Sequence, residues 1–115
     1  MKKTALFAFN GNLMCFAHAM LNVLDLHEKG YDAILIIEGA ACSLLKELNE
    51  EQTPFHKAYR SIIDKKLLSC VCKACCAKLG TLEEAQKQEL PLGADMSGHP
   101  SMEAYLQKGY EIITL

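Results

Sequence analysis

The sequence predicts an α/β fold of three layers, α/β/α, around a mostly parallel sheet of four to five strands. Short apolar, β-branched runs suit strands that are buried on both faces. They alternate with segments in which apolar residues recur every three or four positions, as on an amphipathic helix. This alternation is typical of parallel strands joined by right-handed crossovers through helices. At this length we expect a single domain over residues 1–115.

The first strand and the first helix have clear boundaries. Residues 4–9 are a continuous apolar run that ends at the turn residue Asn10, which predicts a strand. Residues 12–29 carry apolar side chains at helical spacing and stop before Gly30, which predicts a long helix.

The middle of the chain continues the alternation. Residues 31–37 are apolar and β-branched, which predicts a second strand parallel to the first. Residues 40–48 and 54–66 follow helical spacing, and Thr-Pro marks the start of the second of these helices. Residues 67–71 predict a third strand, and a short helix that stops at Gly80 follows it.

The last third predicts two helices and a closing strand. Thr81 and Glu84 have the spacing of a capping box, which predicts a helix that runs to about residue 89. Residues 90–94 suit either a short edge strand or a loop. Residues 100–107 begin with proline and stop before a glycine, as a helix does, and residues 110–115 form an apolar strand.

Composition and charge exclude several classes of partner. The formal net charge of −2 lacks the basic footprint of a nucleic-acid-binding protein, so we expect no nucleic acid. No apolar run approaches the length of a membrane span, so we expect no membrane. Residues 10–12 interrupt the first apolar run below the length of a secretory signal, which favours a cytoplasmic location. Six cysteines in such a chain favour thiol, redox or metal chemistry over structural disulfides.

Four polar or thiol residues follow predicted strands or precede the last helix. In parallel α/β sheets, ligands bind outside the carboxyl ends of the strands. This rule brings together Asn10 after the first strand, Glu38 after the second, Cys72 after the third and His99 before the last helix. Glu38 is either solvated there or a partner of the site. His99 is the best candidate for an acid, a base or a ligand.

Four of the six cysteines lie within residues 70–76, at the predicted junction of strand and helix. Cys72 and Cys75 form a C-x-x-C pair one helical turn apart. The helix N-terminus and Lys73 are expected to favour the Cys72 thiolate. Cys70 and Cys76 are expected to be small core residues.

The remaining cysteines and the orientation of the cluster are predicted from spacing. Cys70 and Cys72 alternate along a strand and are expected to point to one face. Cys15 and Cys42 lie within helical patterns and are expected to pack in the core.

The run Val71-Cys72-Lys73-Ala74-Cys75-Cys76-Ala77-Lys78-Leu79-Gly80, followed by Thr81-Leu82-Glu83-Glu84, resembles the DsrE/DsrF-like family of small sulfur-relay proteins. The loops at residues 9–11 and 95–100 resemble those of an uncharacterised branch of that family. The resemblance implies a doubly wound α/β domain and homo-oligomers such as trimers or hexamers. It also implies transfer of sulfane sulfur as a persulfide, with Cys72 as the sulfur-bearing cysteine.

The leading hypothesis is therefore a cytoplasmic sulfur carrier or sulfurtransferase, with sulfur donor and acceptor proteins as partners and no cofactor. Cys72 would hold the persulfide and Cys75 would be the resolving thiol. His99, with Glu38 or Asn10, would tune ionisation or position the acceptor. Whether the protein is an enzyme or a stoichiometric carrier stays open.

Three alternatives to the sulfur carrier also remain open. The first is a zinc or iron–sulfur domain that uses the cysteines of residues 70–76 together with His99. The second is a thiol–disulfide redox protein that uses the C-x-x-C pair. The third is an oligomeric scaffold whose thiols are inert.

Overall fold

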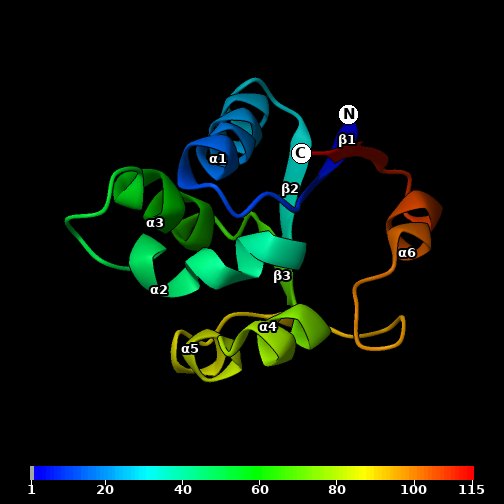
Figure 1. Cartoon of the computed structure of the whole chain (residues 1–115). Helices are drawn as coiled ribbons and strands as arrows, with labels where there is room; N and C mark the ends of the chain where they lie inside the picture. Colours follow the sequence, from blue (N-terminus) through cyan, green and yellow to red (C-terminus); the bar gives the residue numbers. More distant parts are fainter. Residues whose placement is uncertain (1) are drawn as a thin grey trace.

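The structure, a computed structural model, describes residues 2–115 and is built on a five-stranded sheet (Figure 1). The strand order is β4-β3-β2-β1-β5, and every neighbouring pair is parallel. The strands are β1 Lys3–Ala8, β2 Asp32–Ile37, β3 Leu68–Cys72, β4 Leu92–Gly93 and β5 Glu111–Thr114. The predicted parallel α/β fold is confirmed, and the ambiguous stretch at residues 90–94 contains the short strand β4.

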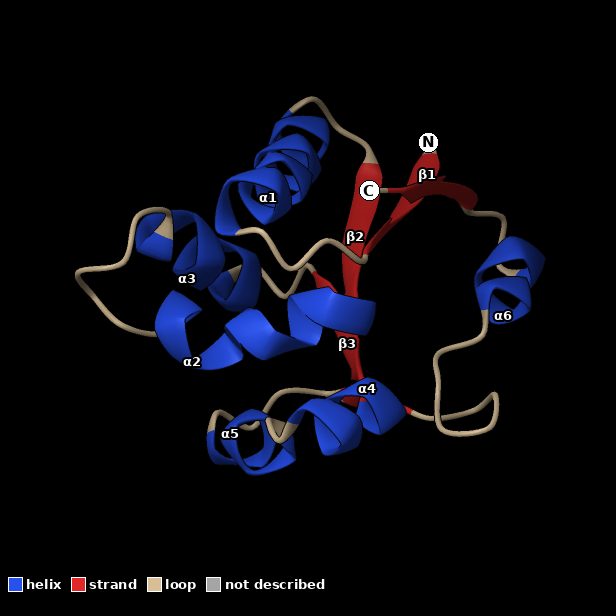
Figure 2. Ribbon diagram, viewed as in Figure 1, coloured by secondary structure: helices blue, strands red, loops and turns tan. Residues whose placement is uncertain are grey.

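The helices cover the two faces of the sheet unequally. They are α1 Leu13–Glu28, the 3-10 helix η1 Gly39–Leu44, α2 Leu45–Leu48, α3 His56–Asp64, α4 Lys73–Leu79, α5 Leu82–Lys87 and α6 Met102–Gln107. In Figure 2, α1, α2 and α3 lie on one side of the strands, α4 and α5 extend that layer downward, and α6 lies on the other side. Among the described helices, α6 alone contributes side chains to the core of the second face.

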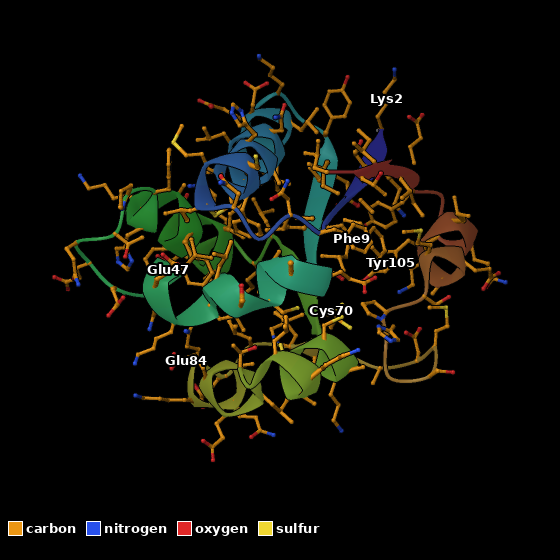
Figure 3. All side chains as sticks on the ribbon, in the orientation of Figure 1. Lys2, Phe9, Glu47, Cys70, Glu84 and Tyr105 are labelled. Carbon is orange, nitrogen blue, oxygen red and sulfur yellow. The ribbon has the colours of Figure 1, made fainter. Side chains whose placement is uncertain are left out.

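Two apolar clusters correspond to the two faces. The larger one packs Met20 and Val23 of α1 and Ile62 of α3 against the sheet. The smaller one joins Phe7 of β1 to Tyr105 of α6, whose rings meet edge to face at 5.5 Å. Figure 3 shows Tyr105 on the α6 side of the sheet. Because the central strands are apolar on both faces, both clusters form on one continuous sheet.

Three local predictions differ from the structure. The segment expected as a helix from residue 40 begins as the 3-10 turn η1 and becomes α-helical only at Leu45. The next helix starts at His56, because Phe55 adopts the left-handed conformation with φ 71°. The capping box is absent: Thr81 is the N-cap of α5, but its side chain makes no capping hydrogen bond.

The short strand β4 returns the chain to the end of β3. Gly93 pairs with Cys72, and a Cβ at position 93 would lie 2.6 Å from Cys70 Sγ. A side chain at this position would collide with the Cys70 thiol, so the close approach of β4 to β3 requires glycine. This approach brings the loop that carries His99 to the carboxyl edge of the sheet.

No helix within residues 2–115 has the length and apolar character needed to cross a membrane.

Candidate functional site

Four side chains from separate parts of the chain converge at the carboxyl edge of the sheet. Glu38 follows β2, Cys72 ends β3, Cys75 lies on α4, and His99 lies in the loop before α6. Their thiol, carboxylate and imidazole atoms all lie within 4.8 Å of one another. The structure thus brings together the groups that the strand-end rule selected after β2, after β3 and before the last helix.

Cys72 is the centre of this group. It is both the last residue of β3 and the N-cap of α4, and its Sγ accepts the backbone N–H of Cys75 at 3.4 Å. Its Sγ also lies 3.1 Å from His99 Nδ1 and 3.8 Å from the Gly98 carbonyl oxygen. The side chain is 0% exposed, so the sulfur is fixed in place and shielded from solvent.

We expected the helix N-terminus and Lys73 to lower the pKa of the Cys72 thiol, and this expectation is wrong. Burial, followed by the neighbouring Cys75 thiol, raises the pKa of Cys72 to about 12. The Cys75 N–H favours the thiolate but does not outweigh burial. Lys73 is exposed and is not among the groups that shift this pKa. The Cys72 thiolate therefore needs a proton acceptor at hand, and His99 Nδ1 is the nearest side-chain nitrogen.

Cys75 is the more accessible thiol of the pair. Its side chain is partly exposed, and its Sγ lies 3.8 Å from His99 Nδ1. A cavity of about 200 Å³ opens beside it, lined by Gly39, Ala40, Cys75, Lys78 and Leu79. A larger cavity of about 530 Å³, lined by Leu24 and Lys65 among others, contains none of the convergent groups. The chemistry therefore points to the smaller cavity as the approach to the thiols.

His99 is held in place through its own loop. Its backbone pairs with Met96 in both directions, at 2.9 and 2.8 Å. The preceding Gly98 carbonyl accepts the Ala74 N–H at 2.8 Å, which ties the loop to the first turn of α4. The imidazole is 39% exposed, so one edge faces solvent while Nδ1 faces the thiols.

Glu38 is a partner of the site rather than a solvated strand end. Its side chain is 9% exposed, and its Oε1 lies 3.7 Å from His99 Nδ1. The carboxylate thus faces the imidazole and the thiols from the end of β2.

Asn10 lies outside this group of four. It is exposed, and its Oδ1 accepts the backbone N–H of Asn12 at 2.8 Å. Asn12 in turn caps α1 by accepting the N–H of Cys15. Asn10 thus shapes the β1–α1 turn, and its predicted role at the site stays a prediction.

The other cysteines are distributed over the core and the surface. Cys70 is buried in the smaller cluster, with its Sγ 3.5 Å from the Tyr105 hydroxyl. Cys72 packs in the larger cluster, so the expected common face for the two residues is wrong. The alternation of β3 stops at Cys72 because the chain turns into α4 there.

Cys42 and Cys76 are both buried in the larger cluster, as predicted. Contact with the Cys76 thiol, followed by burial, raises the pKa of Cys42. Cys15 is exposed on α1, so the expectation that it packs in the core is wrong.

Sequence reasoning missed the link between Gly98 and Ala74, which fixes the His99 loop to α4. The glycine inside that loop was the available signal, since Gly98 has φ +90°.

The chain matches a known protein family over most of its length. The model of the DsrE/DsrF-like family matches residues 7–115. This chain belongs to the DsrE/DsrF-like family. The resemblance noted in the sequence is thus confirmed, with Cys72 and Cys75 both inside the matched region.

Two relatives of this DsrE/DsrF-like chain are uncharacterized proteins, in agreement with an uncharacterised branch. One, from Methanocaldococcus jannaschii, is 35% identical over 104 residues, which cover 90% of this chain and 83% of the relative. The other, from Archaeoglobus fulgidus, is 55% identical over 40 residues, which cover 35% of this chain and 66% of the relative.

Proposed function

We propose that this protein is a cytoplasmic carrier of sulfane sulfur that holds the sulfur as a persulfide on Cys72. Membership of the DsrE/DsrF-like family supports sulfur relay in general. The observation that carries the assignment to this residue is the contact of 3.1 Å between Cys72 Sγ and His99 Nδ1, at a strand end that water does not reach. A buried position suits a persulfide, since it protects the outer sulfur from oxidants and from other thiols.

Sulfur enters through Cys75 in this proposal, because Cys75 is the thiol that an incoming protein can touch. The Cys75 thiolate attacks the outer sulfur of a donor persulfide, R–S–SH. A new S–S bond forms on Cys75, the donor S–S bond breaks, and R–S⁻ leaves with the electron pair and takes up the proton that Cys75 lost.

Cys72 then receives the sulfur from Cys75. The Cys72 thiol transfers its proton to His99 Nδ1, and the resulting thiolate attacks the outer sulfur of the Cys75 persulfide. The S–S bond on Cys75 breaks, and its sulfur leaves as a thiolate that recovers the proton from His99. Two one-atom transfers thus move one sulfur inward, with no oxidant or reductant consumed, and their reversal delivers it to an acceptor.

His99 and Glu38 have separate tasks in this sequence. The raised pKa of Cys72, caused first by burial, makes an adjacent base necessary at neutral pH. Nδ1 is in position to take that proton. The buried Glu38 carboxylate would stabilise the imidazolium formed when it does.

The proposed function also involves partner proteins and assembly of several copies of the chain. We place donor and acceptor proteins at the cavity beside Cys75, and a homo-oligomer, a trimer or hexamer, follows from the family resemblance. Whether transfer is catalytic or stoichiometric depends on turnover, since both cases need the same thiols.

Intact-mass spectrometry of chelator-treated, reduced protein exposed to inorganic polysulfide tests the assignment. The wild-type chain should gain one sulfur atom on Cys72, located by peptide mass spectrometry, in a form that dithiothreitol removes. Cys72→Ser should lose this stable adduct, and Cys75→Ser should load slowly. Cys15→Ser is the matched control, because Cys15 is exposed but lies outside the site. A Cys72→Ser variant that loads as well as the wild type would contradict the proposal.

A thiol–disulfide protein is the second candidate, favoured by the proximity of the Cys72 and Cys75 sulfurs. In that case Cys75 would attack the inner sulfur of a Cys72 persulfide, which releases hydrosulfide and leaves a disulfide. The same mass measurement separates the two functions, because a disulfide lowers the mass by two hydrogens whereas a stored persulfide raises it.

A further inference from the structure

The four convergent groups form a donor set that differs from the zinc site considered as an alternative for the cysteines of residues 70–76 and His99. Glu38 joins Cys72, Cys75 and His99, whereas Cys70 and Cys76 point into the core. The set contains two sulfurs, one imidazole nitrogen and one carboxylate oxygen, which are all atoms that zinc accepts as ligands.

The spacing of these atoms is close to that of a tetrahedral zinc site. Bond lengths of about 2.3 Å to sulfur and about 2.0 Å to nitrogen place those two ligands about 3.5 Å apart at the tetrahedral angle. The observed separations from His99 Nδ1 are 3.1 Å to Cys72 Sγ and 3.8 Å to Cys75 Sγ. For an oxygen ligand at about 2.1 Å the separation from nitrogen is about 3.4 Å, and Glu38 Oε1 lies at 3.7 Å. The three separations from His99 Nδ1 therefore lie close to the tetrahedral values, and the other pairs of ligand atoms lie within 4.8 Å.

Contacts within the protein do not satisfy the hydrogen-bonding capacity of these groups. Within residues 2–115 the Glu38 carboxylate accepts no hydrogen bond, although its side chain is nine-tenths buried. Its separation of 3.7 Å from His99 Nδ1 is too long for a hydrogen bond. A largely buried carboxylate that accepts no hydrogen bond is costly, so its orientation toward the thiols and the imidazole is an independent indication of a bound cation.

His99 Nδ1 gives the same indication. One ring nitrogen makes one hydrogen bond, as donor or as acceptor. Here it faces three groups at once, Cys72, Cys75 and Glu38. A metal ion at their centre would give each of the four groups its own bond.

We propose that Glu38, Cys72, Cys75 and His99 bind one zinc ion at the carboxyl edge of the sheet. Both thiols bind as thiolates and release their protons to solvent, and His99 binds through Nδ1 as the neutral imidazole. Two thiolates and one carboxylate give the zinc complex a net charge of −1. The sulfur ligands select zinc over magnesium and calcium, which prefer oxygen.

This inference goes beyond the sulfur-carrier function and does not depend on it. Zinc uses both sulfurs that the carrier needs, so the bound ion and the persulfide exclude each other. Zinc would therefore block sulfur loading until a stronger ligand removes it.

Metal titration of the reduced, chelator-treated chain tests the site. Zn²⁺ added against a chromophoric competitor should bind with one-to-one stoichiometry. Co²⁺ should give the intense visible bands of a tetrahedral ion and a thiolate charge-transfer band, both removed by Zn²⁺. Substoichiometric binding, or octahedral Co²⁺ without the charge-transfer band, would overturn the proposal.

Four variants identify the ligands. Cys75→Ser should lose the charge-transfer intensity of one thiolate, and Glu38→Gln should weaken zinc affinity by about 10-fold or more. Cys70→Ala and Cys15→Ser should bind zinc like the wild type, because both residues lie outside the donor set. Unchanged affinity in Glu38→Gln, or loss of binding in Cys70→Ala with its fold intact by circular dichroism, would refute this ligand set.

The two proposals fail separately. Metal titration needs no sulfur donor, and sulfur loading is measured with chelator present. Failure to load polysulfide would remove the carrier function and leave the zinc site standing, whereas failure to bind metal would do the reverse.

Discussion

The loop that carries His99 should depend on Gly98 in a way that a single substitution can measure. Gly98 has φ +90°, and a Cβ at this position would lie 3.0 Å from the Cβ of Ala74. In Gly98→Ala the left-handed backbone costs about 1–2 kcal/mol for an L-residue. The close contact adds about 1–3 kcal/mol, since the loop or the first turn of α4 must shift to relieve it.

Gly30 provides a matched control for the backbone strain. It has φ +92°, and no atom lies within 4 Å of a Cβ built there. Gly30→Ala should therefore cost only the conformational strain of about 1–2 kcal/mol. Urea unfolding of both variants should place Gly98→Ala below Gly30→Ala by about 1 kcal/mol or more in free energy of unfolding.

The more informative consequence of Gly98→Ala is local. Displacement of the loop breaks the bond from the Ala74 N–H to the Gly98 carbonyl and moves His99 away from Cys72. An added 1–3 kcal/mol of strain raises the population of the opened loop by about 5- to 150-fold. Alkylation of Cys72, followed by peptide mass spectrometry, should accelerate by that factor relative to Gly30→Ala. Equal labelling and equal stability in the two variants would refute the idea that this loop shields the thiol.

The remaining predictions concern thiol access, the base and two buried polar groups. In the native wild type only Cys15 and Cys75 should react rapidly with a thiol reagent, because Cys42, Cys70, Cys72 and Cys76 are buried; rapid reaction of Cys72 would contradict this. His99→Gln should slow polysulfide loading by about 100-fold or more in stopped-time mass spectrometry, because it removes the proton acceptor; an unchanged rate would exclude His99 as the base. The buried Thr81 hydroxyl has no hydrogen-bond partner within residues 2–115. Thr81→Val should therefore leave the free energy of unfolding unchanged or raise it by about 1 kcal/mol. A loss of stability would instead support the predicted capping box. Gln88 accepts a hydrogen bond from the buried Tyr59 hydroxyl at 2.6 Å and donates one to the Leu45 carbonyl at 2.9 Å. Gln88→Ala should therefore lower the free energy of unfolding in urea by about 1–3 kcal/mol, more than the loss of about 0.5–1.5 kcal/mol in Tyr59→Phe. The reverse order would show that the hydrogen bonds of Gln88 do not stabilise the fold.

The fold could be predicted from the sequence because its strands are apolar on both faces and its long helix has strong periodicity. In a parallel sheet the loops after the strands share the carboxyl edge, so the order of elements predicted that Glu38, Cys72 and His99 lie close together. The family pattern pointed to the same cysteine, so two independent arguments agreed on Cys72.

Burial and side-chain direction could not be predicted in the same way. Cys15 lies within a helical pattern yet is exposed, because it falls on the outer face of α1 with His18 while Phe16 and Met20 face the core. The expected thiolate at Cys72 neglected desolvation, which outweighs the helix N-terminus once β4 and the His99 loop cover the sulfur. Thr81 matched a capping pattern, but its backbone and side chain do not adopt the geometry of one.

The pairing of β1 with β5 has a consequence for how the thiols are exposed during synthesis. These strands join the two ends of the described chain, with Thr4 opposite Glu111, so the sheet closes only after the last strand is made. Cys72 and Cys75 leave the ribosome before His99 and before β5. Parallel pairing between distant segments is slow to form. The nascent chain therefore presents both sulfurs to the surrounding solution before the loop and sheet that shield them exist, and its exposure to oxidants and metals is greatest in that interval.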